Sequence, residues 1–410
     1  MLEKITNKDT GFFKPTIFAT LTLLVSTGIR NTTGLFVSPL VENTVMSLTD
    51  VSMAMAIGQF SFGIFQPLCG MLTTKYRLFT ILLCGALCLI IGLLGIKIAN
   101  TTLLLIVCFG VLAPAGAAAS SFPVLMGHIS HAVPPGKRTI SSGLINAGGS
   151  AGQFILAPLI QIGIDNYGYY GACIFLVFAV TVSMVPSWFL CHTKGAAYSA
   201  DNREIKDGGI RKEIAAVFKI PSYLFLHVGF FACGFHVAFL ATHLPGEIGF
   251  YNYSGSIIAL CFSILGICNI AGCILVGIAG RYGSLKNLLT GVYAIRVVVI
   301  GLYLLAPKIL FTFIVFSIST GLTFGATVPP TGDITARLVH PKYLSTLFGL
   351  IFVTHQIGSF FGAWLGGVVM DHTGSFFSMW IIDACLSVLA AGISFKIRDN
   401  RIPCRSGTTT

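Results

Sequence analysis

The chain consists mostly of long, unbroken runs of apolar residues. A helix needs roughly 20 apolar residues to cross the hydrocarbon core of a membrane, and the pattern predicts twelve spans of about that length. The runs lack the ten-residue alternation of barrel strands, which favours helices. The predicted spans cover residues 16–39, 51–72, 78–98, 102–127, 139–163, 168–190, 221–245, 254–279, 286–306, 309–330, 343–368 and 376–396.

A polar stretch separates the sixth span from the seventh. It reads HTKGAAYSADNREIKDGG and continues into IRKEIAAVFKI, whose amphipathic pattern predicts a short interfacial helix. We therefore expect an N-terminal six-helix bundle at residues 1–190, a cytoplasmic linker at 191–220 and a C-terminal six-helix bundle at 221–410. The predicted fold class is an all-α membrane protein with twelve transmembrane helices in two pseudo-symmetric bundles.

The two predicted bundles share an internal repeat. Seven positions match their counterparts 206 residues later, in three separate regions and in the order that two related bundles require. The first-half positions are Gly28, Arg30, Pro39, Pro123, Pro135, Gly143 and Gly152, and their counterparts are Gly234, His236, Pro245, Pro329, Pro341, Gly349 and Gly358.

Composition excludes a soluble protein. Hydrophobic residues make up 55% of the chain and charged residues 10%, and the mean hydropathy is +0.87, whereas a soluble domain carries about 25% charged residues. Most of the 12 cysteines lie inside apolar spans and none forms a CxxC pair, so we expect free, buried thiols. Neither a cofactor nor a metal ion is predicted.

The net charge of +11 reflects membrane orientation rather than a nucleic-acid partner. With the N-terminus inside, all but four of the 25 Lys and Arg residues fall in cytoplasmic segments; the exceptions are Lys97, Lys308, Arg30 and Arg296. The positive-inside rule then places both termini in the cytoplasm. No cleavable signal pattern precedes the first span. We expect a monomer in the lipid bilayer of the inner (cytoplasmic) membrane.

Several motifs resemble the major facilitator superfamily, and within it the bacterial monocarboxylate-porter-like branch. The segment KRTISSGLINAGGSAGQF resembles that branch's fifth-span signature at Lys137, Arg138, Gly143, Ala147 and Gly148. The segments GIRNTTGLFVSPL, GFFACGFHVAFLATHLP and FGLIFVTHQIGSFFGAWLGG resemble its first, seventh and eleventh spans. The resemblance covers nearly the whole chain and implies alternating-access transport through a cavity lined by the first and seventh spans.

The chain also departs from the superfamily's patterns. In GMLTTKYR, Thr74 stands where an acidic residue is usual and Arg77 where a glycine is usual. In VGIAGRYG, Gly280 takes the acidic position. Animal monocarboxylate carriers place Asp and Arg in the eighth span where this chain has Asn269 and Cys273. The roles of that Asp and that Arg in the animal carriers can therefore not be assigned to Asn269 and Cys273.

An ionisable side chain inside a membrane is costly, so each is a candidate functional group. Arg30 lies about 15 residues, or roughly 22 Å, into the first span, and its guanidinium offers two parallel donors to a carboxylate. His236, the repeat counterpart of Arg30, is expected to face it across the cavity and to exchange the coupled proton. His355, Gln356, Asn146 and Asn269 are further candidate substrate contacts, although such groups also join helices.

Arg296 and Asp383 form the last candidate pair. Both are predicted near mid-depth in the second bundle, as a structural ion pair or, alternatively, as a second anion site and a proton carrier. We also expect five glycines to pack across the interface between the bundles, with packing inside each bundle as the alternative; these are Gly148, Gly152, Gly358, Gly362 and Gly366.

These features predict a proton-coupled secondary transporter of a small organic anion, with a monocarboxylate favoured. A larger polycarboxylate, such as a citrate-based siderophore, and transport in the export direction remain alternatives. A non-transporting membrane sensor is an alternative of another class, although no appended signalling domain is seen. An enzyme is not expected, because the chain has no HExxH motif and no pair of acidic residues within its spans.

Overall fold

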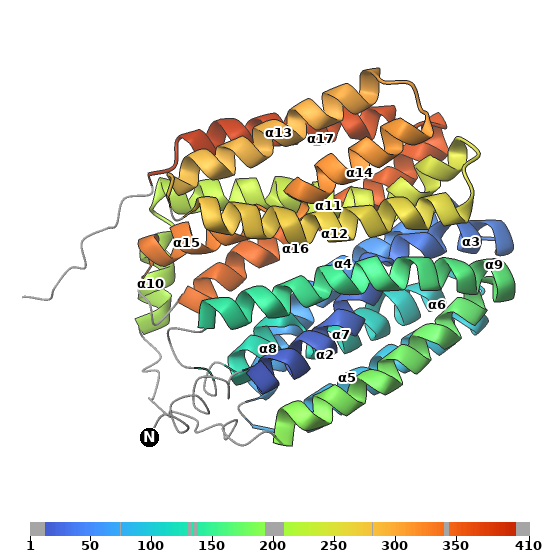
Figure 1. The fold of residues 1–410 in the computed structure, drawn as a ribbon, viewed down its shortest axis with the longest axis horizontal. Coiled ribbons are helices and arrows are strands. Elements are labelled where there is room, and N and C mark those ends of the chain that lie inside the picture. The colour runs from blue at the N-terminus through green and yellow to red at the C-terminus, as the bar shows by residue number, and fades with distance from the viewer. Residues whose placement is uncertain are drawn as a thin grey trace, which may run out of the picture.

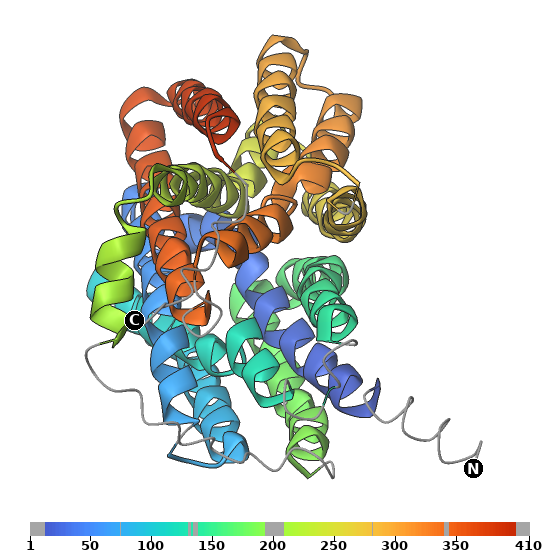
Figure 2. The same cartoon turned by 90° about the vertical axis from the view of Figure 1, so that its left-hand side faces the viewer.

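The computed structural model describes residues 13–73, 75–129, 133, 138–192, 209–280, 282–339 and 344–398. Within these ranges the regular elements are all helices. They form two bundles (Figure 1; Figure 2 shows the same halves turned by 90°), the N-terminal half from α2 to α9 in blue to green and the C-terminal half from α11 to α17 in yellow to red. Lys137 and most of the predicted linker lie outside the described residues.

The N-terminal half contains both continuous and interrupted helices. α2, η1 and α3 together make one broken span, and η3 is a π-helical segment between α6 and α7. The elements are α2 (Phe13–Asn31), η1 (Thr33–Phe36), α3 (Val37–Asn43), α4 (Leu48–Leu72), α5 (Leu78–Gly95), η2 (Ile96–Ile98), α6 (Thr102–Leu105), η3 (Ile106–Leu112), α7 (Ala113–Ala119), α8 (Phe122–Ile129) and α9 (Arg138–His192).

The C-terminal half is more regular. It is preceded by the short helix α10 (Gly209–Val217), which lies at the left end of the molecule in Figure 1. We call this end the linker end, and the opposite end, where α3 lies, the distal end. The helices are α11 (Pro221–Phe250), α12 (Gly255–Ala279), α13 (Leu285–Leu305), α14 (Leu310–Phe324), α15 (Val328–Leu338), α16 (Leu344–Thr373) and α17 (Phe377–Phe395). α14 and α15 together make one span.

The predicted twelve-helix architecture is confirmed. Ten segments of the described chain are long and apolar enough to cross a membrane. One of them, α9, turns at Gly168, whose φ of 70° lies in the left-handed region that glycine tolerates, and so supplies two spans. The broken first span completes the set.

The repeated glycines make equivalent contacts in the two halves. A Cβ atom at Gly28 would collide with the backbone of Gly152, which joins α2 to α9. In the C-terminal half, a Cβ atom at Gly358 would collide with the backbone of Phe231, which joins α16 to α11. Helices in lipid associate closely where small residues let their backbones meet.

The prediction that the five glycines at four-residue spacing pack across the interface between the halves is wrong. Gly148 and Gly152 pack against α2 within the N-terminal half, and Gly358, Gly362 and Gly366 pack against α11 within the C-terminal half. The four-residue spacing indicates close helix packing but does not identify the partner helix. The glycines hold each half together rather than joining the two.

The halves meet from mid-depth to the distal end. At mid-depth Asn269 Nδ2 donates to Ser150 Oγ (3.0 Å) and Ser263 Oγ donates to the Phe154 carbonyl (3.2 Å). At the distal end the backbone of η1 at Gly34 approaches that of α11, and the backbone N–H of Thr49 donates to Asp371 Oδ2 at 2.7 Å. Asp371 therefore caps the N-terminus of α4 from the other half.

We predict that Asp371→Ala weakens the distal closure. A carboxylate at a helix N-terminus is worth about 0.3–1 kcal/mol, so the open population should rise roughly two- to five-fold. Spin labels introduced as unnatural amino acids at exposed Val45 and Phe377 would report the change as a longer distance component. Asp371→Asn keeps an acceptor and should shift less. Identical distance distributions in all three proteins would contradict the capping role.

Candidate functional site

Arg30 lies at the end of α2, just before the chain turns into η1. Its Nη2 donates to Gln59 Oε1 on α4 at 2.6 Å, and its guanidinium carbon lies 4.3 Å from the centroid of the Phe62 ring. The Nε–H, on the same edge of the guanidinium as Nη2, is buried and has no hydrogen-bond partner among the described residues. Half of this two-donor edge is therefore unused.

A pocket lies beside Arg30 inside the N-terminal half. The space between its lining atoms amounts to about 460 Å³, a volume that includes space open to the surroundings. Arg30, Gln59 and Thr33 supply its polar atoms, whereas α4, α5, η3 and α7 supply mostly apolar walls. The main apolar residues are Met55, Leu89, Leu93, Phe109, Ala113 and Ala117.

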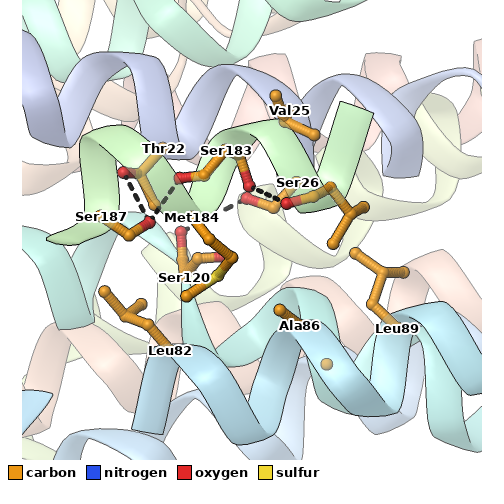
Figure 3. Close-up of a pocket in the computed structure, with 12 residues that line it drawn as sticks. Thr22, Val25, Ser26, Leu82, Ala86, Leu89, Ser120, Ser183, Met184 and Ser187 are labelled. Atoms are coloured by element: carbon orange, nitrogen blue, oxygen red, sulfur yellow. Dashed lines mark hydrogen bonds between the residues drawn. The ribbon is translucent and has the colours of Figure 1, made fainter. Parts of the chain in front are cut away.

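A second pocket in the same half has a different character (Figure 3). It lies between α2, α5, α7 and the later part of α9, and hydroxyl groups line it. These hydroxyls are engaged with one another or with helix carbonyls, as where Thr22 Oγ1 meets Ser187 Oγ at 3.1 Å and Ser26 donates to the Ser120 carbonyl. The pocket has no charged lining residue, so it is less suited to an anion than the Arg30 pocket.

His236 and Asp383 form a buried pair in the C-terminal half. Nδ1 of His236 on α11 lies 2.6 Å from Oδ2 of Asp383 on α17, and the two side chains are 1% and 0% exposed. The other Asp383 oxygen and His236 Nε2 are buried without a hydrogen-bond partner among the described residues. A carboxylate and an imidazole at this distance can share a proton away from lipid.

Asp383 therefore pairs with His236. The predicted structural pair of Asp383 with Arg296 is not formed. Arg296 on α13 is fully buried and donates from Nη2 to the Thr323 carbonyl at 2.8 Å. It lies close enough to His236 and His355 to act on both electrostatically. The depths inferred from sequence brought Arg296 near the pair, but they could not show which side chain reaches the carboxylate.

The expectation that His236 faces Arg30 is also not met. His236 Nδ1 turns to α17, inside the C-terminal half. His355 on α16 packs against the Phe230 ring with 5.7 Å between ring centroids, also inside the C-terminal half. Sequence equivalence between the halves does not make two side chains meet, because only residues on the facing helix surfaces do so.

The three remaining candidates differ in their surroundings. Asn269 receives the Gly325 N–H at 2.9 Å and donates to Ser150, so its amide joins helices. Gln356 packs against Gly63 of the other half, and its buried Oε1 lacks a hydrogen-bond partner among the described residues. Asn146 is exposed on α9. Gln356 and Asn269 both reach the interface between the halves, and Gln356 lies against α4, the helix that holds Gln59 on Arg30.

The sequence analysis missed Glu247. The seventh span was expected to end at residue 245, but α11 continues to Phe250, and Glu247 is 6% exposed. It accepts hydrogen bonds from Tyr303 Oη (2.6 Å) and Trp380 Nε1 (2.8 Å). Burial lowers the pKa of nearby Lys308, an effect that the Glu247 carboxylate opposes. The eleven-residue spacing from His236, about three helical turns, could have placed Glu247 on the same face of α11.

Comparison with known proteins identifies the family. The sequence profile of the Major Facilitator Superfamily matches residues 18–308. The chain belongs to this superfamily. It is similar to monocarboxylate transporter 13 of Rattus norvegicus, with 23% identity over 367 residues, 87% of this chain and 81% of that one. The same transporter from Bos taurus is 23% identical over 351 residues, 83% and 78% of the two chains. The resemblance predicted from the motifs is confirmed.

Solved structures of the superfamily share the fold. A D-xylose–proton symporter matches with a TM-score of 0.77 and 13% identity, covering 94% of this chain and 97% of that one. A bacterial homologue of the human lysosomal transporter Spinster matches with a TM-score of 0.73 and 13% identity, covering 97% and 99%. At such identities the similarity concerns the arrangement of helices alone.

We predict that Asp383→Ala strongly destabilises the C-terminal half. Removing one partner of a buried charged pair typically costs about 3–5 kcal/mol, because the remaining polar groups lose their compensation. Thermal unfolding in detergent should therefore begin at a markedly lower temperature. Asp383→Asn should cost less, and Asp333→Ala, at an exposed position on α15, should have little effect. Equal stability of the Asp383→Ala and Asp333→Ala proteins would argue against a buried charged pair.

Proposed function

We propose that this superfamily member carries a small organic anion, a monocarboxylate, across the cytoplasmic membrane by proton-coupled alternating access. The observation that carries the proposal is the Arg30 guanidinium on the wall of an otherwise largely apolar pocket, with Nη2 engaged by a neutral amide and Nε–H unused. The names of the similar vertebrate transporters support the substrate class.

The free edge of Arg30 suits a carboxylate. A carboxylate can accept from Nε–H and Nη2–H in parallel, whereas the Gln59 oxygen accepts only from Nη2. The substrate would displace Gln59 from the guanidinium and satisfy both donors. Because the neighbouring walls are apolar, little water competes for the bond, and the interaction gains strength.

The pocket favours a monocarboxylate over a polycarboxylate. Arg30 is its one charged lining residue among the described residues, so a second or third carboxylate would lack a cation and would lose its hydration. From the C-terminal half, Gln356 packs against Gly63 of α4 and is the residue proposed to contact the polar end of the substrate as the halves move.

The coupled proton binds at His236 and Asp383. Their short hydrogen bond holds a site that a proton can enter or leave. With the linker end in the cytoplasm, as the distribution of Lys and Arg indicates, the distal closure faces outside.

We predict that Arg30→Gln reduces uptake of a labelled monocarboxylate by about 10- to 100-fold, the loss expected for a hydrogen bond to a charged group. Uptake into proteoliposomes provides the measurement, and Arg30→Lys should retain part of the activity because it keeps the charge but loses the planar edge. Lys97→Gln, at the distal end, is the matched control. Normal uptake by Arg30→Gln would remove Arg30 from the mechanism.

We predict that His236→Gln separates anion movement from the proton. An imposed pH gradient should no longer drive accumulation, because glutamine cannot take up the proton, whereas exchange of labelled for unlabelled anion should continue. Accumulation and exchange can be measured on the same proteoliposomes. His243→Gln is the matched control, since His243 lies on the same helix but bonds the Ala363 carbonyl. Gradient-driven accumulation by His236→Gln would refute the assignment.

A further inference from the structure

We infer that the apolar pocket beside Arg30 receives the hydrocarbon tail of the substrate, and that Phe109 on the π-helical segment η3 determines which tail length fits. The inference rests on the proposed function, because it takes the Arg30 guanidinium as the carboxylate site. It adds a position for the rest of the substrate and a residue that selects among substrates.

The π-helical segment has a local cause in the sequence. Pro114 has no N–H, and in a regular α-helix its ring would clash with the carbonyl of Gly110 four residues earlier. The chain widens instead, and the N–H of Ala113 reaches the Cys108 carbonyl, five residues back. Short π-helical segments of this kind often occur at functional sites.

The widened turn borders the pocket directly. Phe109 from η3, with Ala113, Pro114 and Ala117 from α7, lines it. Phe109 is 4% exposed, and its ring packs edge-on against Phe36 with 5.9 Å between ring centroids. The ring is therefore a fixed wall rather than a mobile flap.

α4 also lines the pocket and packs closely against η3 and α7. A Cβ atom at Gly58 would lie 3.1 Å from the Phe109 carbonyl oxygen and 3.2 Å from Pro114 Cγ. α4 also supplies Met55 to the pocket and holds Gln59 on Arg30. α4 thus holds Gln59 on Arg30 and also borders the apolar space beside it. The packing of α4 against η3 and α7 therefore sets the length available to a tail.

The occupant with matching chemistry is an unbranched alkyl chain joined to one carboxylate. Its head would meet the donors of Arg30 and its methylenes would meet Met55, Leu93 and Phe109. Each buried methylene improves binding roughly four-fold, until the chain meets the wall. Affinity should therefore rise with chain length to an optimum and then fall.

The test is competition by straight-chain monocarboxylates, from acetate to octanoate, against uptake of one labelled acid into proteoliposomes. Phe109→Leu shortens the wall residue and should move the optimum to a longer acid by one or two methylenes, with a roughly four-fold change in relative inhibition for each. Ala117→Val fills the pocket and should move the optimum to a shorter acid. Met55→Ala, on the α4 wall, should act like Phe109→Leu and provides a second widened protein.

Ala86→Val is the matched control. It adds the same two methyl groups in the same half, but Ala86 lines the hydroxyl pocket, so the length optimum should stay unchanged. If the wild type transports monocarboxylates and the optimum is the same in Phe109→Leu, Met55→Ala and Ala117→Val, the tail position is wrong and the proposed function stands. If the wild type transports none of the acids, the proposed function fails together with this inference.

Discussion

Hydrocarbon cannot solvate a charge, and this constraint governs the interior of the protein. Each charged group within the membrane needs a partner inside the protein. Asp383 has His236, Arg296 has the Thr323 carbonyl, and Glu247 has Tyr303 and Trp380. Arg30 differs in the kind of partner, because its Nη2 contacts a side-chain amide that can turn away, whereas the carbonyl that Arg296 contacts is fixed in the backbone of α14. Arg30 also lines a pocket, so a carboxylate can approach it and displace Gln59.

The same constraint explains why so much of the fold was predictable. Spans must be long, apolar and helical, so their number and approximate positions follow from the runs of apolar residues along the chain. The glycines that recur 206 residues apart indicated a repeat, and Gly28 and Gly358 make equivalent close contacts in the two halves. The exact ends of the helices do not follow from these runs, because a helix can continue past the last apolar residue. The seventh helix extends past Pro245 and takes Glu247 into the bundle.

The partners of individual side chains were harder to predict. Asp383 and Arg296 were correctly placed within spans, but the rotation of each helix about its axis decides which groups meet, and a rotation of a few tens of degrees exchanges one neighbour for another. His236 accordingly bonds α17 instead of facing Arg30. The apolar pocket could not be predicted either, because it depends on how the π-helical segment η3 packs with residues from five other elements of the N-terminal half.

The burial of the His236–Asp383 pair has a mechanical consequence. On the proposed function, the proton is held inside one bundle and the anion is held beside the other, so the two ions do not neutralise each other by contact. Their energies are linked only through the rigid-body rearrangement that both bundles share. Substrate choice and energy source then occupy separate modules, and evolution can alter one by changing the N-terminal half while leaving the other intact.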